Sequence, residues 1–300
     1  MSDAAKTASR GQPGDAILIT GGAHGLGLET ALHLAERGFK VCATVRDLGQ
    51  RPAVLEAAAA RGVSVEVVQL DLTDHASIKA GVEAAVALNG GIFGLVNNGS
   101  IGLRGCLEDV TDDEVRRVFE TNVIGTVALT REVLPHLRRA GRGRIVNISS
   151  VGGRISAFGV GIYCASKFAL EGLGEALALE VQPFGLQAIL IEPGIIKTTR
   201  WTSNRGTAEG ALDPTSPYRL LFEASEAMAD RLVERSKTTP QDVAEAVYHA
   251  LTVEKPKMRY VVGRPASLVV KLRRHLPEPL FERLYFGTFL RRINAAAAPE

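Results

Sequence analysis

Hydrophobic residues gather along this chain in short runs that alternate with longer segments of helical periodicity. Four apolar runs, AILIT, KVCATV, VSVEVVQL and IFGLVNN, begin after residue 15, and each is followed by a helical pattern. RIVNIS, a helix over about residues 162–181, LQAILIEP and RYVVG continue the alternation. Crossover helices between parallel strands produce this rhythm. The pattern therefore predicts an α/β fold, a doubly wound, mostly parallel sheet of seven strands with helices on both faces.

Composition divides the chain into three segments. Residues 1–14 are small and polar, with interspersed Gly and Pro, which predicts a disordered lead-in. Residues 15–262 contain no linker rich enough in Pro, Gly or Ser to split them, so we expect a single domain there. Within that domain, the loop-like stretch 198–217 is the candidate for a substrate lid. Residues 263–300 are expected to form a basic, amphipathic C-terminal helical extension.

Charge and cysteine content narrow the class of protein. A net charge of +2 over 300 residues provides no general attraction to nucleic acid, so we expect no nucleic-acid partner. No apolar run reaches the roughly 18 to 20 residues that span a bilayer, and the first residues lack the apolar core of a secretory signal. Three widely separated cysteines indicate neither a disulfide framework nor a zinc cluster. We therefore expect a cytoplasmic protein without a metal site.

A glycine-rich loop follows the first predicted strand. The segment TGGAHGLG places Gly21, Gly25 and Gly27 in a GxxxGxG spacing, with Leu26 between the last two, at the opening of a helix. Glycines let the backbone turn tightly and approach a pyrophosphate, and the helix amino terminus supplies N–H donors. Because a strand precedes the loop and a helix follows it, we interpret it as a dinucleotide-binding loop rather than a plain turn.

The end of the second predicted strand bears on the choice of cofactor. NAD-binding units tend to place a carboxylate there, but this chain has Val45, followed by Arg46, whose guanidinium suits a 2′-phosphate. This arrangement predicts NADP(H). The alternative is that Arg46 is a solvated surface cation and that Asp47 binds the ribose of NAD. At the next strand end, Asp71 and Leu72 are expected to meet the adenine ring, although Asp71 is equally compatible with a helix cap.

Catalytic residue types occur in the segment that runs from RIVNISS to YCASK. Tyr163 and Lys167 are four apart, so on a helix they share a face. A nearby ammonium and an oxidised nicotinamide would both favour the phenolate, which makes Tyr163 a candidate general acid or base. Ser150, just past a strand end, is placed to polarise a carbonyl, whereas Ser149 should face the opposite side. A YxxxK pair alone is commonly a surface pair, but the upstream glycine loop favours an active site.

With these motifs, residues 16–262 resemble a short-chain dehydrogenase/reductase with TGxxxGxG and YxxxK signatures. The resemblance implies a Rossmann-type fold and places the family's asparagine, which supports the lysine through a water, at Asn122 in FETNVIGTV. The implied catalytic tetrad is Asn122, Ser150, Tyr163 and Lys167. Tyr163 and Lys167 are also counted as cofactor ligands, since the family's lysine touches the nicotinamide ribose.

Two further family patterns concern the cofactor. The PGxxxT pattern matches Pro193, Gly194 and Thr198, and implies that Thr198 and the Ile196 backbone hold the nicotinamide carboxamide. The family's NNAG segment, which lines the cofactor ribose, is matched from Asn98 and its neighbours, but serine replaces the last glycine in NNGS. We expect that substitution to be tolerated because its side chain is small.

The helix YCASKFALEGLGEALALEVQPFG and the ATVRD strand end most resemble the branch with 17β-hydroxysteroid and retinol dehydrogenases. That branch favours apolar substrates, so we expect a bulky apolar ketone, aldehyde or alcohol, such as a steroid-, retinoid- or polyketide-like compound. An apolar rim without a charged anchor agrees with this, although each member is equally compatible with ordinary core. The rim candidates are Leu103, Phe158, Ile195, Trp201, Tyr218, Leu221 and Phe222.

The extension and the partners allow more than one interpretation. Ten basic residues after residue 254 oppose three acidic ones, a composition compatible with peripheral contact to an anionic membrane, or with packing over the sheet or a neighbouring subunit. The family resemblance implies a homodimer or homotetramer formed through long helices. A non-catalytic NADP-binding redox sensor or scaffold is the main rival function, and retention of the tetrad argues against it. A sugar epimerase or dehydratase is disfavoured by the glycine spacing and the chain length.

Overall fold

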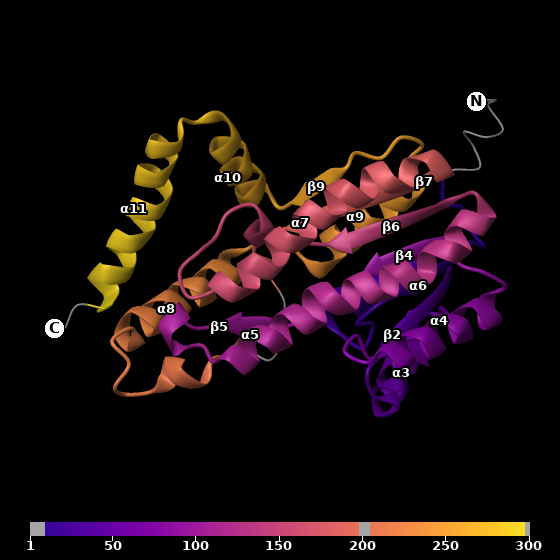
Figure 1. Ribbon diagram of the computed structural model, residues 1–300, viewed down its shortest axis with the longest axis horizontal. Helices are drawn as coiled ribbons and strands as arrows, with labels where there is room; N and C mark the ends of the chain where they lie inside the picture. The colour runs from indigo at the N-terminus through magenta and orange to yellow at the C-terminus, as the bar shows by residue number, and fades with distance from the viewer. Residues whose placement is uncertain (1–9, 198–204, 298–300) are drawn as a thin grey trace.

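The computed structural model describes residues 10–197 and 205–297, and within them seven strands form one sheet in the order β3-β2-β1-β4-β6-β7-β9 (Figure 1). The strands are β1 (Ala16–Ile19), β2 (Lys40–Val45), β3 (Glu66–Gln69), β4 (Gly94–Asn97), β6 (Gly143–Ile148), β7 (Leu186–Pro193) and β9 (Arg259–Val262). The seven predicted strands and the doubly wound order are confirmed. Neighbouring strands of this sheet pair in parallel throughout, so the sheet is more uniform than the "mostly parallel" prediction.

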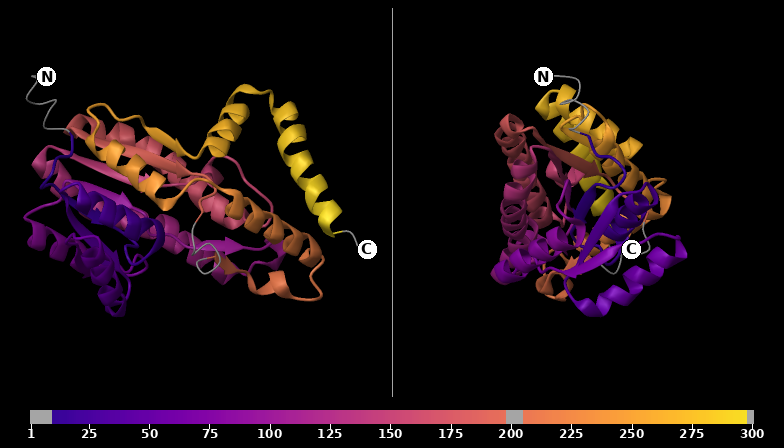
Figure 2. Two further views of the ribbon diagram at one scale, coloured as in Figure 1. Left: turned by 180° about the vertical axis from the view of Figure 1, so that it is seen from behind. Right: turned by 90° about the vertical axis from the view of Figure 1, so that its right-hand side faces the viewer.

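Helices cover both faces of the sheet, as Figure 2 shows in its end-on view. One face packs against α2 (Gly25–Glu36), α3 (Arg51–Ala60) and α9 (Pro240–Thr252), and the other against α4 (His75–Asn89), α6 (Gly125–Ala140) and α7 (Gly161–Val181). Because the central strands are buried on both faces, they appear in the sequence as continuous apolar runs rather than as alternating ones.

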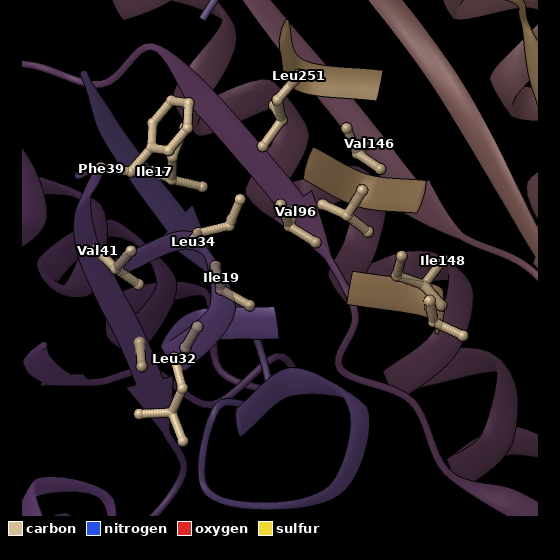
Figure 3. Close-up of a cluster of buried hydrophobic side chains, with 14 of the residues drawn as sticks. Ile17, Ile19, Leu32, Leu34, Phe39, Val41, Val96, Val146, Ile148 and Leu251 are labelled. Atoms are coloured by element: carbon tan, nitrogen blue, oxygen red, sulfur yellow. The ribbon is translucent and has the colours of Figure 1, made fainter. Parts of the chain in front are cut away.

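The core on the α2 and α9 face shows how the sheet is held (Figure 3). Ile17 and Ile19 of β1 lie beside Val96 of β4 and pack against Leu34 of α2 and Leu251 of α9, all with 1% or less of their surface exposed. Burial of each such side chain stabilises the fold by about 1.5 to 3 kcal/mol relative to an exposed one. This packing anchors the carboxyl ends of β1 and β4 and thereby the loops that leave them.

The site lies where the chain order of the sheet reverses. β1 is flanked by β2 and β4, so the connections after β1 and β4 diverge to opposite faces at the carboxyl edge, where open α/β sheets generally bind their ligands. The strand register brings Asn97 opposite Asn147 and Ile148 opposite Ile191. The residues that follow β1, β4, β6 and β7 therefore lie side by side along one edge.

A second, two-stranded sheet was not predicted. β5 (Gly102–Arg104) pairs in parallel with β8 (Arg205–Thr207), and a short turn, η6 (Glu209–Leu212), follows β8. The prediction of a loop over 198–217 is therefore wrong for residues 205–207 and 209–212 and holds for 213–217, while 198–204 lie outside the described residues. Three-residue strands have no readable periodicity, and tertiary contacts alone align them. The remaining elements are the helix α8 (Arg219–Arg235) and the shorter η1 (Leu48–Gln50), η2 (Leu107–Asp109), α5 (Asp112–Phe119), η3 (Glu120–Ile124), η4 (Val151–Gly153) and η5 (Gln182–Phe184).

The two ends of the described chain are attached to the domain in different ways. Gly11 is buried and donates its backbone N–H to the carbonyl of Leu251 at 2.7 Å, so this part of the predicted lead-in is bound to α9. The C-terminal helices α10 (Arg264–His275) and α11 (Glu278–Ala297) form a V that projects from the sheet, and α11 returns to pack along α8 (Figures 1 and 2). The predicted C-terminal helical extension is confirmed.

Candidate active site

The glycine loop has a geometry that other residues would not permit. Gly21 and Gly25 have φ of 66° and 58°, in the left-handed region. A Cβ at Gly27 would collide with the carbonyl oxygen of Gly21 and lie 2.5 Å from Nδ2 of Asn98. That amide donates to the carbonyl of Thr20 at 2.8 Å and so ties the loop to the end of β4. The contact of Asn98 with a ribose remains a prediction, since its side-chain donor already serves the loop.

The start of α2 fits a dinucleotide phosphate. The N-cap residue His24 does not cap the first turn with its side chain, so the N–H groups of Gly25, Leu26 and Gly27 point out of the helix end. Apart from its chain neighbours and the backbone of α2, no atom of the described residues lies within 4 Å of the position that a Cβ on Gly25 would occupy. An open cradle with unpaired donors at a helix amino terminus is what an anionic group requires.

The end of β2 favours one of the two cofactor interpretations. Asp47 is exposed, and its Oδ1 accepts the N–H of Gly49 at 2.8 Å to cap the turn that follows. Arg46 is also exposed, and within the described part of the chain its guanidinium makes no ion pair. A carboxylate engaged as a cap is less available to a ribose, whereas the Arg46 guanidinium has its donors available for a phosphate.

The end of β3 settles the alternative for Asp71. Its Oδ1 accepts from the backbone N and the hydroxyl of Thr73, at 2.9 and 2.8 Å, whereas the cap of α4 is Asp74. Asp71 therefore shapes the turn and does not cap the helix. Leu72 is buried, and its Cδ1 would lie 2.8 Å from a Cβ at Gly99, which explains why glycine fits there. Contact of Asp71 and Leu72 with adenine remains a prediction.

Tyr163, Lys167 and Ser150 converge at the end of β6. Lys167 is buried, with 2% of its surface exposed, and its Nζ donates to the carbonyl of Ile148 at 3.0 Å. The same Nζ lies 5.7 Å from the centre of the Tyr163 ring. Ser150 forms a hydrogen bond with the Tyr163 phenol, and its Oγ accepts the N–H of Gly152 at 3.0 Å. The Ser150 hydroxyl and the Tyr163 phenol are therefore neighbours; their joint contact with a substrate oxygen remains a prediction.

Burial shifts the pKa values of both residues toward their neutral forms. It raises the pKa of Tyr163 to about 12, against the opposing effect of the hydrogen bond from Ser150. Burial also lowers the pKa of Lys167 to about 8, and the nearby Glu171 carboxylate opposes that shift. At neutral pH, Tyr163 is therefore a phenol that can donate a proton to an oxygen placed beside Ser150.

Asn122 lies in η3, a π-helical turn between α5 and α6, and it is fully buried. Its Oδ1 accepts the N–H of Ile101 at 2.8 Å, and its Nδ2 donates to the Ile101 carbonyl at 2.9 Å and to Oγ of Ser166 at 3.0 Å. π-helical turns occur frequently at functional sites. The amide reaches the residue next to Lys167, and support of the lysine through a water remains a prediction.

The predicted nicotinamide segment is described only in part. The N–H of Gly194 donates to the carbonyl of Val262 at 3.0 Å, and a Cβ at Gly194 would lie 2.5 Å from Cβ of Ala266 on α10. Packing against the extension therefore explains this glycine, a reason the sequence did not reveal. Pro193 ends β7, the side chain of Ile196 is buried in the core, and Thr198 lies outside the described residues.

The apolar rim divides into core and surface. Leu103 and Phe222 are buried in a separate hydrophobic cluster, so the ordinary-core interpretation holds for them. Phe158, Tyr218 and Leu221 are half-buried, and Ile195 is exposed, while Trp201 lies outside the described residues.

An aromatic group on α11 was missed by the sequence analysis. Phe281 and Tyr285 stack with ring centres 5.3 Å apart, and Phe286 meets Tyr285 edge-on. Burial raises the pKa of Tyr285. These aromatic residues lie on the helix that packs along α8. Aromatic residues one, four and five positions apart on a helix carry no signal of which element they pack against.

Comparison with known proteins places the chain in a family. A model of the short chain dehydrogenase family matches residues 15–209. Human 17-beta-hydroxysteroid dehydrogenase type 1 is 39% identical over 264 residues, covering 86% of this chain and 80% of that protein. Human retinol dehydrogenase 8 is 37% identical over 251 residues, 81% of this chain and 79% of its own. A 3-ketodihydrosphingosine reductase of Bacteroides thetaiotaomicron is 34% identical over 267 residues, 89% and 94% of the two chains.

The chain therefore belongs to the short-chain dehydrogenase family, oxidoreductases that act on alcohol and carbonyl groups with a nicotinamide cofactor. The predicted resemblance to the 17β-hydroxysteroid and retinol dehydrogenase branch is confirmed. A short-chain dehydrogenase from Streptomyces avermitilis has the same fold with a TM-score of 0.76 and 31% identity, covering 92% of this chain and 98% of its own.

Two solved structures carry a cofactor. A metagenomic short-chain oxidoreductase in complex with NADP has a TM-score of 0.66 and 25% identity, covering 84% of this chain and 97% of its own. A short-chain dehydrogenase/reductase from Burkholderia phymatum in complex with NAD has a TM-score of 0.74 and 25% identity, covering 91% and 95%. Structures similar to this chain thus bind either cofactor.

Proposed function

We propose that this protein is an NADP(H)-dependent oxidoreductase that interconverts a bulky apolar ketone or aldehyde and the corresponding alcohol. The observation that carries the proposal is the arrangement at the end of β6. There the Tyr163 phenol is hydrogen-bonded to Ser150, and the buried Lys167 ammonium lies beside the Tyr163 ring. The glycine loop at the end of β1, which β4 separates from β6, supplies the phosphate cradle.

Each residue has a distinct task in this reaction. Nicotinamide, when bound, supplies or accepts the hydride at the reacting carbon. Tyr163 donates its proton to the carbonyl oxygen in reduction and takes it back in oxidation, and Ser150 holds that oxygen by a hydrogen bond. Lys167 stabilises the phenolate left behind, because an ammonium near a phenolate favours the charged form. Asn122 holds Ser166 and so fixes the turn of α7 that carries the lysine.

NADP(H) is proposed over NAD(H) on the chemistry at the end of β2. Val45 and Arg46 stand where an NAD enzyme carries a carboxylate, and Asp47 is engaged as a cap. A guanidinium binds a phosphate through paired, charge-assisted hydrogen bonds.

Two observations support the proposal of an apolar substrate. The half-buried rim of Phe158, Tyr218 and Leu221 is apolar, apart from one phenol. Three relatives are named for a hydroxysteroid, retinol and 3-ketodihydrosphingosine, and each of these compounds has a large apolar part and a hydroxyl or ketone group.

We further propose a homodimer formed through α7. Phe168 and Leu179 on this helix expose 46% and 69% of their surface. Large apolar side chains that lie together on a surface often mark a contact with another protein chain. Burying such a helix face against its symmetry copy is the usual solution.

Peripheral contact with an anionic membrane is proposed for the V of α10 and α11. No helix in the part of the chain that the structure describes is both long and apolar enough to cross a bilayer. The surface of α10 and α11 instead exposes both leucines and basic residues, a composition that favours the interface of a bilayer. The exposed members are Leu268, Leu272, Leu280, Leu284, Arg264, Lys271, Arg274 and Arg283.

The proposed function is tested by measuring NADPH and NADH consumption with a panel of steroid, retinoid, long-chain and small ketones. We expect turnover with NADPH on the large apolar members, lost in Tyr163→Phe and kept in Tyr248→Phe, a matched change on α9. Binding of NADPH without turnover of any carbonyl would instead support a redox sensor.

A further inference from the structure

Two glutamates lie buried behind the catalytic lysine. Glu171 is four residues after Lys167 on α7, so both side chains project from one face of the helix. Glu171 has 6% of its surface exposed, and Glu192, the next-to-last residue of β7, has none. Carboxylates are seldom buried without partners, since removing a charge from water is costly. None of the tasks described above involves either residue.

Two arginines from other elements hold this acidic pair. Arg259 on β9 places its Nε 2.9 Å from Oε2 of Glu171 and 3.1 Å from Oε1 of Glu192. Arg154, just after η4, contacts the same oxygen of Glu192 at 3.1 Å and lies 4.0 Å from Glu171. Segments far apart in sequence thus meet behind the lysine and fix both carboxylates.

Glycine at position 153 allows this meeting. A Cβ on Gly153 would lie 2.9 Å from the backbone oxygen of Lys167 and 3.0 Å from Cγ of Glu171. Both distances are shorter than a normal contact, so only glycine lets η4 approach α7 this closely. The approach brings Arg154 to the pair, and it leaves little space around the turn of α7 between Lys167 and Glu171.

Charge in this cluster bears directly on the lysine. The Glu171 carboxylate opposes the effect of burial on the pKa of Lys167, whereas burial, followed by the charge of Glu171, raises the pKa of Glu192. Oε1 of Glu171 and Oε2 of Glu192 accept no hydrogen bond from the described residues. Charged groups facing Glu171 come from four elements: Lys167 and Glu175 of α7, Arg154 after η4, Glu192 of β7 and Arg259 of β9.

We propose that Glu171 is a positioning residue for the reaction: its buried carboxylate, set by Arg259, Arg154 and Glu192, keeps Lys167 charged. The inference rests on the proposed function, because a charged lysine matters only if Tyr163 must become a phenolate. If Glu171 had only a structural role, its ion pairs would still form, but the pKa of Lys167 would not depend on the charge at position 171.

The direct test titrates Lys167 by NMR in the full-length protein labelled with ¹³C at lysine Cε, without substrate. Its signal is identified by its loss in Lys167→Arg. The wild-type midpoint is expected at about 8. Glu171→Gln should lower it by about one pH unit or more, because an opposite charge at close range is removed. Glu171→Asp keeps the charge and should restore most of the difference.

A matched control and a variant of opposite sign complete the test. Glu175→Gln removes a carboxylate from the same helix and the same arginine, but its side chain is 58% exposed, so the midpoint should stay in place. Arg259→Gln removes a positive charge and should raise the midpoint. If Glu171→Gln does not fold, the rise of the Lys167 midpoint in Arg259→Gln tests the proposal in its place. An unchanged midpoint in Glu171→Gln or Arg259→Gln, or an equal shift in Glu175→Gln, overturns the proposal.

Activity provides a separate readout. On any ketone that the wild type reduces, the alkaline decline of the rate should move to lower pH in Glu171→Gln, by as much as the NMR midpoint. A rate that is lower by one factor at every pH would indicate a structural role and refute the assignment. Absence of turnover in the wild type would refute the proposed function, while the NMR result would still stand.

Discussion

The β6–α7 region, residues 143–181, and the C-terminal extension, residues 264–297, both carry charged side chains, but in opposite surroundings. In the first, Lys167 and Glu171 are buried and their nearest neighbours are specific partners. In the second, α10 has no buried residue, and its basic side chains are exposed except Arg273, which is half-buried and pairs with Glu278. Burial makes the behaviour of a charge depend on groups a few ångströms away, whereas an exposed basic helix depends on what approaches it. The predictions below test this contrast.

The largest effect is expected at Tyr163. Tyr163→Phe removes only the phenolic oxygen and keeps the ring packing, so NADPH binding should survive while single-turnover hydride transfer falls by about 10²- to 10⁴-fold. Fluorescence titration of NADPH and rapid-mixing kinetics measure the two quantities. A variant that keeps more than about a tenth of the wild-type rate would rule out Tyr163 as the general acid.

Arg46 should affect the cofactor alone. Arg46→Ala removes a charge-assisted contact of about 1.5 to 3 kcal/mol and should weaken NADP binding roughly 10- to 100-fold while NAD binding changes little. Calorimetric titration with both cofactors checks this, with Arg51→Ala, at another exposed arginine nearby, as the control. Equal losses for NADP and NAD would contradict the role of Arg46.

Replacement of Lys167 should show how much its buried charge destabilises the fold. Its folded-state pKa of about 8 lies below the ordinary value of 10.5, so the unfolded chain binds the proton more tightly. Burial of the Lys167 cation destabilises the fold fully below pH 8, and this destabilisation disappears as the pH rises to 10.5. The free energy of unfolding therefore increases with pH in this window.

Lys167→Met should therefore unfold at a higher urea concentration than the wild type at pH 7, although it is inactive, and this advantage should shrink toward pH 10.5. Denaturation curves at several pH values measure it, with the exposed Lys79→Met on α4 as control. A difference that does not vary with pH would mean that the lysine is not buried as a cation.

The smallest effect is expected at the extension. Replacing Leu268 and Leu284 by serine should reduce flotation of the protein with anionic vesicles at low salt, because apolar area and charge act together at a bilayer interface. Leu88→Ser, equally exposed but on α4, should float like the wild type. If the wild type itself remains at the bottom of the gradient, the membrane contact is refuted.

Much of the fold followed from local pattern. Runs such as KVCATV and LQAILIEP became β2 and β7 because a strand buried on both faces must be apolar along its length. The pairing of β5 with β8 left no such trace, since three residues are too few to show a period. Part of the substrate loop was therefore taken for irregular structure.

The local features of the candidate site could likewise be predicted from the sequence, whereas its contacts between distant segments could not. Four-residue spacing placed Tyr163 and Lys167 on one helix face, and the glycine loop indicated a phosphate cradle, because these geometries are local. The partners of Asn122, the contact of Gly194 with Ala266 and the packing of α11 along α8 join distant segments, and periodicity carries no information about them.

The sequence alone determined which side chains are available for proton and hydride chemistry and on which elements they lie. Only the tertiary structure decided how they behave. Lys167, Glu171 and Glu192 are ordinary charged residues in the sequence. The pKa of Lys167 falls and that of Glu192 rises because the folded chain removes both groups from water. Arg154 and Arg259, which other elements bring against Glu192, oppose the rise of its pKa. Desolvation and close charges act through space, and distance along the chain does not encode them.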